Sequence, residues 1–199
     1  MSDVANPTVY TIGHSTRPVE TFVDMLRAVG VTMLVDVRSI PRSRTNPHYN
    51  LDTLPETLEP YQIGHVHITE LGGRRPRQQE VDPALNGFWQ NQSFHNYADY
   101  ALSDSFARGY RYLLDHSAGQ RSAIMCAEAV WWRCHRRIIA DYLINDGREV
   151  VHLVGPGRSE LARITPSARS REGHLIYPEL SQEPRSATSC RFWGGNAIS

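Results

Sequence analysis

The opening part of the chain constrains the fold most, because two strand-like runs flank one helix-like run. Residues 8–12 are rich in β-branched and aromatic side chains, and residues 32–37 are apolar without alternation. Between them, apolar side chains recur at three- and four-residue spacing over residues 22–29, which is the period of an α-helix. A continuous apolar strand is typical of a parallel sheet that is covered on both faces. We therefore predict a strand–helix–strand unit, with Ser15 or Thr16 as the helix cap.

The alternation of strands and helices continues to about residue 154. Further strands are predicted at 66–69, 122–126 and 149–154, and helices at 94–102, 104–116 and 134–145. The segments 39–60 and 76–93 are rich in proline and polar residues, as is typical of loops. This order predicts an α/β fold with a Rossmann-like, mostly parallel sheet and helices on both of its faces.

A single domain accounts for most of the 199 residues. We expect it to span residues 1–155. Residues 156–199 carry prolines, serines and arginines with little periodicity, so we expect a C-terminal tail that is poorly structured or wraps the domain.

Composition excludes several function classes. All 21 basic residues are arginine, so mechanisms that need a lysine, such as Schiff-base chemistry or the Walker motif, are excluded within this chain. The formal net charge is zero, so no overall field attracts nucleic acid or an anionic membrane, and we expect neither as a partner. Residues 13–18 lack the second and third glycines of a dinucleotide-binding fingerprint. We therefore expect no nicotinamide cofactor, and the sequence points to no other.

The location expected from the sequence is the cytoplasm. The N-terminus shows no secretory signal, and no apolar run reaches the roughly 18 residues of a membrane span. The chain has three cysteines, of which Cys190 stands alone near the C-terminus, so they do not form an even disulfide framework. That usage fits a reducing compartment.

Chemically versatile side chains gather in residues 124–137. This segment holds two thiols, one carboxylate, one imidazole and three guanidiniums between a predicted strand and a predicted helix. In an open α/β sheet, ligands bind at the loops that leave the carboxyl ends of the strands. We therefore expect the functional site here.

Four sequence blocks stand at predicted strand ends. They are Gly13-His14-Ser15, Asp36-Val37-Arg38, Leu71-Gly72-Gly73-x-Arg75, and Cys126-x-Glu128 followed by Cys134-His135-Arg136. Together they resemble the domain of unknown function 488 family, over about residues 8–154. The resemblance implies a small cytoplasmic Rossmann-like protein and leaves the reaction open.

Four residues are candidates for catalysis. We assign acid–base chemistry to His14, Glu128 and His135, because side chains from separate strand-end loops commonly converge in α/β active sites. Gly13 would let the backbone beside His14 approach a ligand closely. Cys126 could be a nucleophile if nearby guanidiniums lower its pKa, or only a wall of the site. The alternatives are a helix cap or arginine partner for Glu128 and a capping or surface position for His135.

Ser15, Arg38, Arg75 and Arg136 are candidates for binding the substrate. Guanidiniums bind carboxylate or phosphate through paired hydrogen bonds, so these side chains indicate a small anionic ligand. The alternative for Arg38 and Arg75 is a buried ion pair with Asp36 or Glu70.

Two other kinds of site are weighed against this one. A phosphatase or rhodanese loop is rejected because one residue too many separates Cys126 from Arg133, and because the loop has two tryptophans and no glycine. Cys126, Glu128, Cys134, His135 and His14 include the common zinc-ligand types. The cysteine spacing is not that of a zinc finger, however, and the arginines would repel a cation, so we expect no metal.

The function expected is that of an enzyme, a hydrolase or transferase, acting on a small anionic or nucleotide-like substrate by glycosyl-bond or phosphate-ester chemistry. The alternatives are a non-catalytic ligand-binding or sensor module, or a thiol redox or metal-binding protein that uses Cys126 and Cys134.

Overall fold

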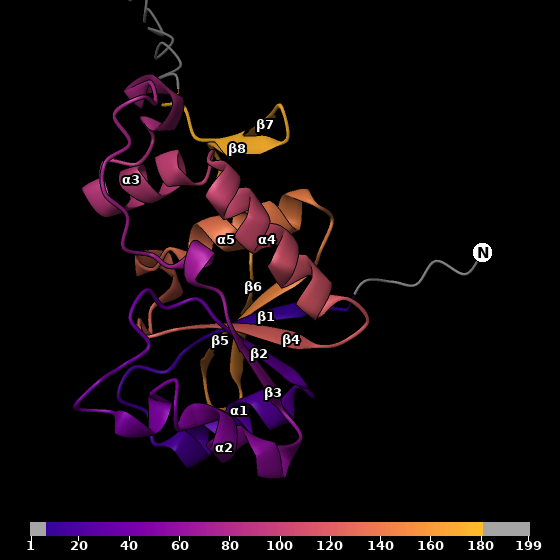
Figure 1. The fold of residues 1–199 in the computed structure, drawn as a ribbon. Coiled ribbons are helices and arrows are strands. Elements are labelled where there is room, and N and C mark those ends of the chain that lie inside the picture. Colours follow the sequence, from indigo (N-terminus) through magenta and orange to yellow (C-terminus); the bar gives the residue numbers. More distant parts are fainter. Residues whose placement is uncertain (1–6, 181–199) are drawn as a thin grey trace, which may run out of the picture.

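The fold is built on a six-stranded sheet in the order β3-β2-β4-β1-β5-β6 (Figure 1). The computed structural model describes residues 7–180. The strands are β1 (Val9–Gly13), β2 (Met33–Asp36), β3 (Gly64–His67), β4 (Ser122–Cys126), β5 (Val150–Gly155) and β6 (Arg158–Leu161). The first five pair in parallel, and β6 pairs with β5 in antiparallel orientation. The predicted Rossmann-like, mostly parallel α/β sheet is confirmed.

Helices cover both faces of the sheet (Figure 1). On one face lie α1 (Val19–Ala28) and α2 (Leu54–Leu58), which pack with the strands in one apolar cluster. On the other lie α3 (Gln92–Tyr100), α4 (Asp104–Ser117) and α5 (Arg136–Asn145), which share the larger cluster. Short 3₁₀ helices occupy Pro47–Tyr49, Glu59–Tyr61, Thr69–Leu71, Pro83–Asn86 and Trp131–Arg133. None of the helices within residues 7–180 is long and apolar enough to cross a membrane.

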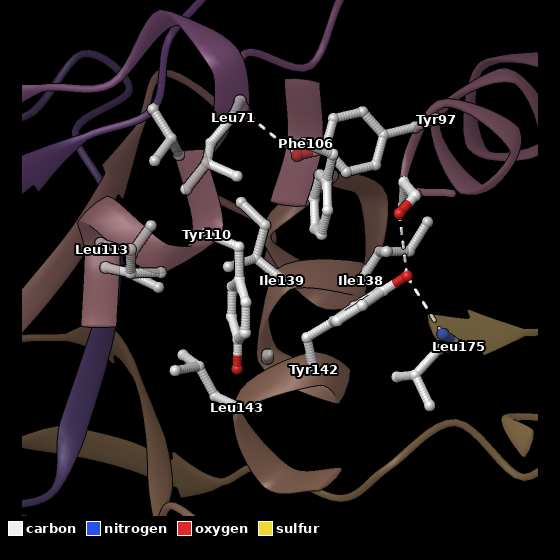
Figure 2. Packing of buried hydrophobic residues seen from close by; sticks show 14 of the residues in the cluster. Leu71, Tyr97, Phe106, Tyr110, Leu113, Ile138, Ile139, Tyr142, Leu143 and Leu175 are labelled. Carbon is white, nitrogen blue, oxygen red and sulfur yellow. Dashed lines mark hydrogen bonds between the residues drawn. The ribbon is translucent and has the colours of Figure 1, made fainter. Parts of the chain in front are cut away.

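Tyrosines organise the larger core (Figure 2). The buried Tyr142 hydroxyl donates to the Ala101 carbonyl at 3.0 Å and accepts from the Leu175 N–H at 3.1 Å. The Tyr97 hydroxyl donates to the Leu71 carbonyl at 2.8 Å. Because each hydroxyl is satisfied, the rings can be buried without a desolvation penalty. The bond from Tyr97 to Leu71 also fixes the turn that leads into the candidate site.

Several element boundaries differ from the sequence prediction. Neither Ser15 nor Thr16 caps α1: its N-cap is Pro18, without a side-chain hydrogen bond. The backbone N–H of Ser15 instead donates to the Ala127 carbonyl at 2.9 Å, which ties the end of β1 to the loop after β4. Helix α5 begins two residues later than predicted because Cys134 has an extended backbone, with φ of −123° and ψ of 143°.

The region after residue 155 contains strands that the sequence pattern does not predict. In addition to β6, the strands β7 (Arg169–Arg171) and β8 (His174–Ile176) form an antiparallel pair. All residues of β6 and β7 are exposed, so these strands lack the apolar pattern on which a prediction depends. Cys190 lies outside the described residues.

Candidate functional site

The candidate site lies at the carboxyl ends of β1, β2 and β4. Strand β4 lies between the other two, and the helix that follows β1 covers one face of the sheet while the helix that follows β4 covers the other. Neighbouring loops therefore diverge at this edge, which is the arrangement that opens a ligand crevice in α/β proteins. A cavity of about 360 Å³ is present there, lined from residues 38–40, 73–74, 93–94, 126–128 and 133–135.

Gly13 allows the loop after β4 to close over the end of β1. A Cβ atom at this position would overlap the Glu128 carbonyl oxygen and lie 2.6 Å from Ala129 Cα. The close approach that we expected at Gly13 is thus made by the protein's own backbone.

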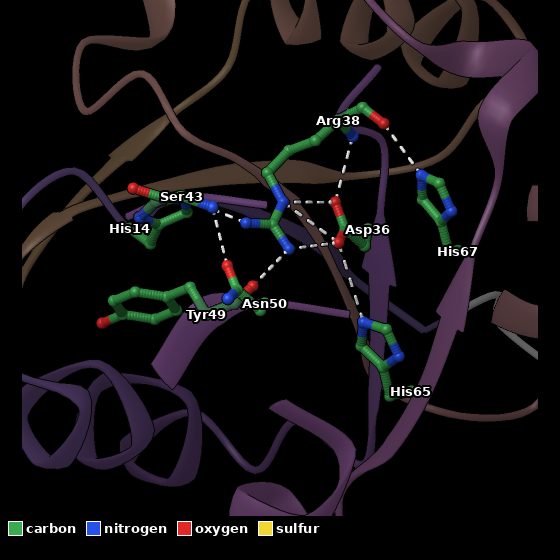
Figure 3. A network of polar contacts seen from close by, with 8 residues as sticks. All are labelled: His14, Asp36, Arg38, Ser43, Tyr49, Asn50, His65 and His67. Atoms are coloured by element: carbon green, nitrogen blue, oxygen red, sulfur yellow. Dashed lines mark hydrogen bonds and ion pairs between the residues drawn. The ribbon is translucent and has the colours of Figure 1, made fainter. Parts of the chain in front are cut away.

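A network centred on Arg38 forms the wall beside β2 (Figure 3). The Arg38 guanidinium donates to both Asp36 oxygens, at 2.9 Å through Nε and 2.6 Å through Nη2. It also donates to the Tyr49 carbonyl at 2.6 Å and to His14 Nε2 at 3.3 Å. Arg38 and Asp36 are only 4% and 0% exposed, so the two charges cancel inside the protein. The ion pair that we weighed as the alternative for Arg38 is present.

Two histidines of β3 support this pair. His67 Nε2 donates to the Arg38 carbonyl at 2.8 Å, and His65 Nε2 lies 3.8 Å from Asp36 Oδ2. Burial alone would raise the pKa of Asp36, but contacts from His65 and Arg38 outweigh it and hold that pKa below its ordinary value. Asp36 is therefore a permanent anion.

His14 lies behind Arg38 and does not line the cavity. Its Nδ1 donates to the Ser15 carbonyl at 2.8 Å, so Nε2 carries the lone pair that accepts from Arg38. Its ring stacks on Tyr49 at 4.2 Å between centroids. Burial, together with the Arg38 charge, lowers the pKa of His14 to about 4. In this position His14 is a neutral acceptor that orients Arg38.

Two thiols and an imidazole form the floor of the cavity. The potential ligand atoms of Cys126, Cys134 and His135 all lie within 4.8 Å of one another. Cys134 Sγ is 3.6 Å from His135 Nδ1, and His135 Nε2 donates to the Val37 carbonyl at 3.1 Å. We call these three residues the thiol cluster. Within residues 7–180, it is the group of side chains best suited to hold a metal ion.

The two thiols shift each other's pKa in opposite directions. The hydrogen bond to Cys134 and burial raise the pKa of Cys126 well above its ordinary value. For Cys134, burial is outweighed by the Cys126 hydrogen bond and the Arg136 charge, and the pKa is lowered. Of the two thiols, Cys134 is therefore the one whose surroundings favour the thiolate form.

Arg136 lies behind the thiol cluster and is 1% exposed. Its Nε donates to Cys134 Sγ at 3.3 Å, and Nη2 donates to the Glu128 carbonyl. Its side chain is not part of the cavity wall. Arg136 thus fixes the loop after β4 and supplies positive charge to the thiols.

Arg75 and Ser15 also lie outside the cavity wall. The Arg75 guanidinium donates to the carbonyls of Thr69, Glu70 and Gly72 and stacks over the Tyr100 ring at 3.9 Å. It binds the backbone of Glu70 and not its carboxylate. Of the four residues predicted to bind substrate, Arg38 alone lines the cavity.

Two further arginines face the cavity and were not among the residues predicted to bind substrate. Arg74 and Arg133 are exposed, and within residues 7–180 neither guanidinium forms a hydrogen bond or an ion pair. Glu128 lies on the same wall, where its Oε1 accepts from the Val130 N–H at 3.1 Å. The arginine runs around residues 74 and 133 were the available signal, but sequence alone does not say which member of a run is free.

Comparison with known families finds a matching sequence model. It is described as Domain of unknown function DUF488 and matches residues 18–143, which is more than half of the chain. The chain belongs to the DUF488 family. The DUF488 match includes Arg38, the Gly72–Gly73 pair and the whole thiol cluster, and it begins after His14. Comparison with curated proteins and with solved structures gives no match. The DUF488 description names no reaction, so the reaction must be argued from the site itself.

Proposed function

We propose that this DUF488 protein is an enzyme that binds a small anionic substrate, of the phosphate-ester or nucleotide class, in the cavity beside the thiol cluster. The observation that carries the proposal is a difference between the arginines that line the cavity. The charge of Arg38 is neutralised by Asp36, whereas Arg74 and Arg133 face the cavity without a partner among residues 7–180. Two free guanidiniums against one carboxylate favour an anion.

The cavity suits a molecule larger than a simple ion. Its volume of about 360 Å³ lies within the range that ligand pockets occupy. Ile40 and Phe94 give it an apolar side, opposite in character to the two guanidiniums. A phosphate joined to a sugar or a base combines these properties.

Glu128 is the group placed for proton transfer. Its carboxylate is exposed at the cavity, and while Oε1 is held by the Val130 N–H, Oε2 has no partner within residues 7–180. A carboxylate held at one oxygen and free at the other can take a proton from an attacking group and, once protonated, give it to a leaving group.

Binding is tested by calorimetric titration with inorganic phosphate, AMP and adenosine. AMP should bind more tightly than adenosine, and Arg74→Gln or Arg133→Gln should each weaken AMP binding about tenfold, the typical contribution of a charge-assisted contact. Arg111→Gln, which removes an exposed arginine of α4, is the matched control and should have no effect. Equal affinity for AMP and adenosine would contradict the proposal.

Catalysis is tested separately with Glu128→Gln. Release of phosphate or of free base from AMP-class substrates should fall at least about a hundredfold, the usual contribution of a positioned acid or base. AMP affinity should change little. Wild-type protein that binds AMP but turns over none of these substrates would instead be the non-catalytic binding module.

A further inference from the structure

We infer that Cys126, Cys134 and His135 form a zinc site with a fourth coordination position open to the cavity. The sequence led us to expect no metal, because the cysteine spacing fits no zinc-finger pattern. The structure changes that argument, since the 3₁₀ helix Trp131–Arg133 returns the chain to the end of β4 and places Cys134 beside Cys126.

The distances fit one small ion. Zinc binds sulfur at about 2.3 Å and nitrogen at about 2.0 Å in tetrahedral geometry, which places a sulfur and a nitrogen ligand about 3.5 Å apart. Cys134 Sγ and His135 Nδ1 are 3.6 Å apart. The ligand atoms of all three residues lie within 4.8 Å of one another, as a shared ion requires.

The tautomer of His135 is fixed by the backbone. Its Nε2 must donate to Val37, because a carbonyl oxygen can only accept. In the neutral ring Nδ1 then carries the lone pair, and Nδ1 is the atom that faces Cys134. Histidines that bind metals typically donate their second nitrogen to a carbonyl or carboxylate in this way.

Gly73 holds the imidazole in place. A Cβ atom at residue 73 would overlap His135 Nδ1 and lie 2.7 Å from its Cγ and Cε1. Only glycine allows the backbone to pack this closely on the ring.

Neither Arg136 nor Arg38 opposes the ion. Two thiolates balance the charge of Zn²⁺, so the occupied site is neutral. Arg136 donates to Cys134 Sγ at 3.3 Å, which stabilises a thiolate and leaves its other lone pairs for a metal. The charge of Arg38 is neutralised by Asp36. The donor set of two sulfurs and one nitrogen favours zinc over calcium or magnesium.

All three ligands line the cavity, which indicates a catalytic and not a structural site. Structural zinc is usually closed by four protein ligands, whereas catalytic zinc keeps one position for water or substrate. The open position would face the cavity that Arg74 and Arg133 also line. This catalytic meaning rests on the proposed function, whereas the presence of zinc does not.

The test is the metal content of the full-length protein. Wild type, expressed with zinc, should contain one zinc per chain by elemental mass spectrometry. After removal of the metal by a chelator, Co²⁺ should produce a thiolate charge-transfer band and intense visible bands typical of tetrahedral coordination. Cys134→Ser and His135→Gln should lose the metal, while His116→Gln, at a half-buried position of α4 outside the cavity lining, should retain it.

Three outcomes would overturn the inference. The first is wild-type protein that takes up no stoichiometric Zn²⁺ or Co²⁺, a result that does not depend on any variant folding. The second is reduced protein that forms a Cys126–Cys134 disulfide in air and still binds no metal after reduction, as a thiol redox protein would. Loss of zinc in Cys190→Ser would show a fourth protein ligand and no open position.

The zinc inference and the proposed function can fail independently. Arg133→Gln should keep the zinc and lose phosphate affinity. If zinc is absent but Arg133→Gln still weakens phosphate binding, only the metal site is wrong; if zinc is present and the arginine has no effect, only the anion pocket is wrong.

Discussion

The Arg38 network and the thiol cluster border the same cavity but use their polar atoms differently. In the network, the Arg38 guanidinium donates to Asp36, Tyr49 and His14. Its charge is neutralised by Asp36, whose Oδ2 lies 2.6 Å from Arg38 Nη2. In the thiol cluster, the sulfurs and His135 Nδ1 face one another and have few other partners. Buried polar groups whose bonds are complete stabilise the fold. Groups whose lone pairs converge are available for a ligand.

The largest effect is expected from breaking the Arg38 network. Asp36→Asn removes the anion and leaves a guanidinium that is 4% exposed without its counter-charge. Breaking one partner of a buried pair costs about 3–5 kcal/mol of folding free energy. Urea unfolding should show this loss.

An exposed ion pair provides the control for that experiment. Arg42 and Asp52 lie 3.7 Å apart with side chains that are 78% and 67% exposed. Asp52→Asn should change the free energy of unfolding by less than about 1 kcal/mol. Equal effects of the two substitutions would mean that burial of the Arg38 pair has no energetic consequence.

Sequence pattern was sufficient for the parts of the fold with strong periodicity. The strand–helix–strand opening and the strand before the thiol cluster were located to within a residue or two, because runs such as residues 122–126 are buried along their whole length. Strand β6 was missed because its residues are all exposed and it is held by backbone hydrogen bonds to β5. Such pairing leaves no pattern in the side chains.

The location of the site could be predicted, but which of its side chains are free to contact a ligand could not. Arg75 and Arg136 are long side chains near strand ends, as anion-binding arginines would be, yet both are saturated by backbone carbonyls or sulfur. Whether a guanidinium is free depends on which carbonyls the folded loops bring to it. The same holds for Cys134, whose distance to Cys126 is set by the 3₁₀ helix between them.

The Arg38 network should also make stability depend on pH. The pKa of His14 is about 4 in the folded protein and about 6.5 in the unfolded chain. Between these values the unfolded chain binds a proton that the folded protein excludes, so stability falls as the pH is lowered from 6.5 towards 4, by up to about 3 kcal/mol.

His14→Gln should reduce this pH dependence. Near pH 5, unfolding of the variant should take up about one proton fewer than unfolding of the wild type. His152, whose pKa burial also lowers to about 4, continues to contribute in both proteins. The measurement is the slope of the unfolding free energy against pH, and identical slopes would show that His14 is accessible to protons in the folded state.

Gly73→Ala should disturb the thiol cluster and leave the Arg38 network in place. The new methyl group would overlap His135, and relief of such overpacking costs about 1–3 kcal/mol. Displacement of the imidazole should also weaken Co²⁺ binding at least about tenfold, since one ligand is lost. At Gly155, the nearest atom to an added Cβ is 4.0 Å away, so Gly155→Ala is the matched control and should change neither quantity. Unchanged cobalt binding in Gly73→Ala would mean that His135 is not a ligand.

The smallest effect on stability is expected from the two arginines that are proposed to bind the anion. Arg74 and Arg133 make no hydrogen bond or ion pair within residues 7–180, so the double variant Arg74→Gln/Arg133→Gln should change the free energy of unfolding by less than about 0.5 kcal/mol. Arg38→Gln, although it removes only one charge, should cost several times more because Asp36 is left buried and unpaired. An arginine that contributes nothing to stability but is needed for anion binding has its guanidinium free to contact a ligand. If urea unfolding instead shows a comparable loss for both variants, the free arginines have a structural role, and the distinction between the two sides of the cavity disappears.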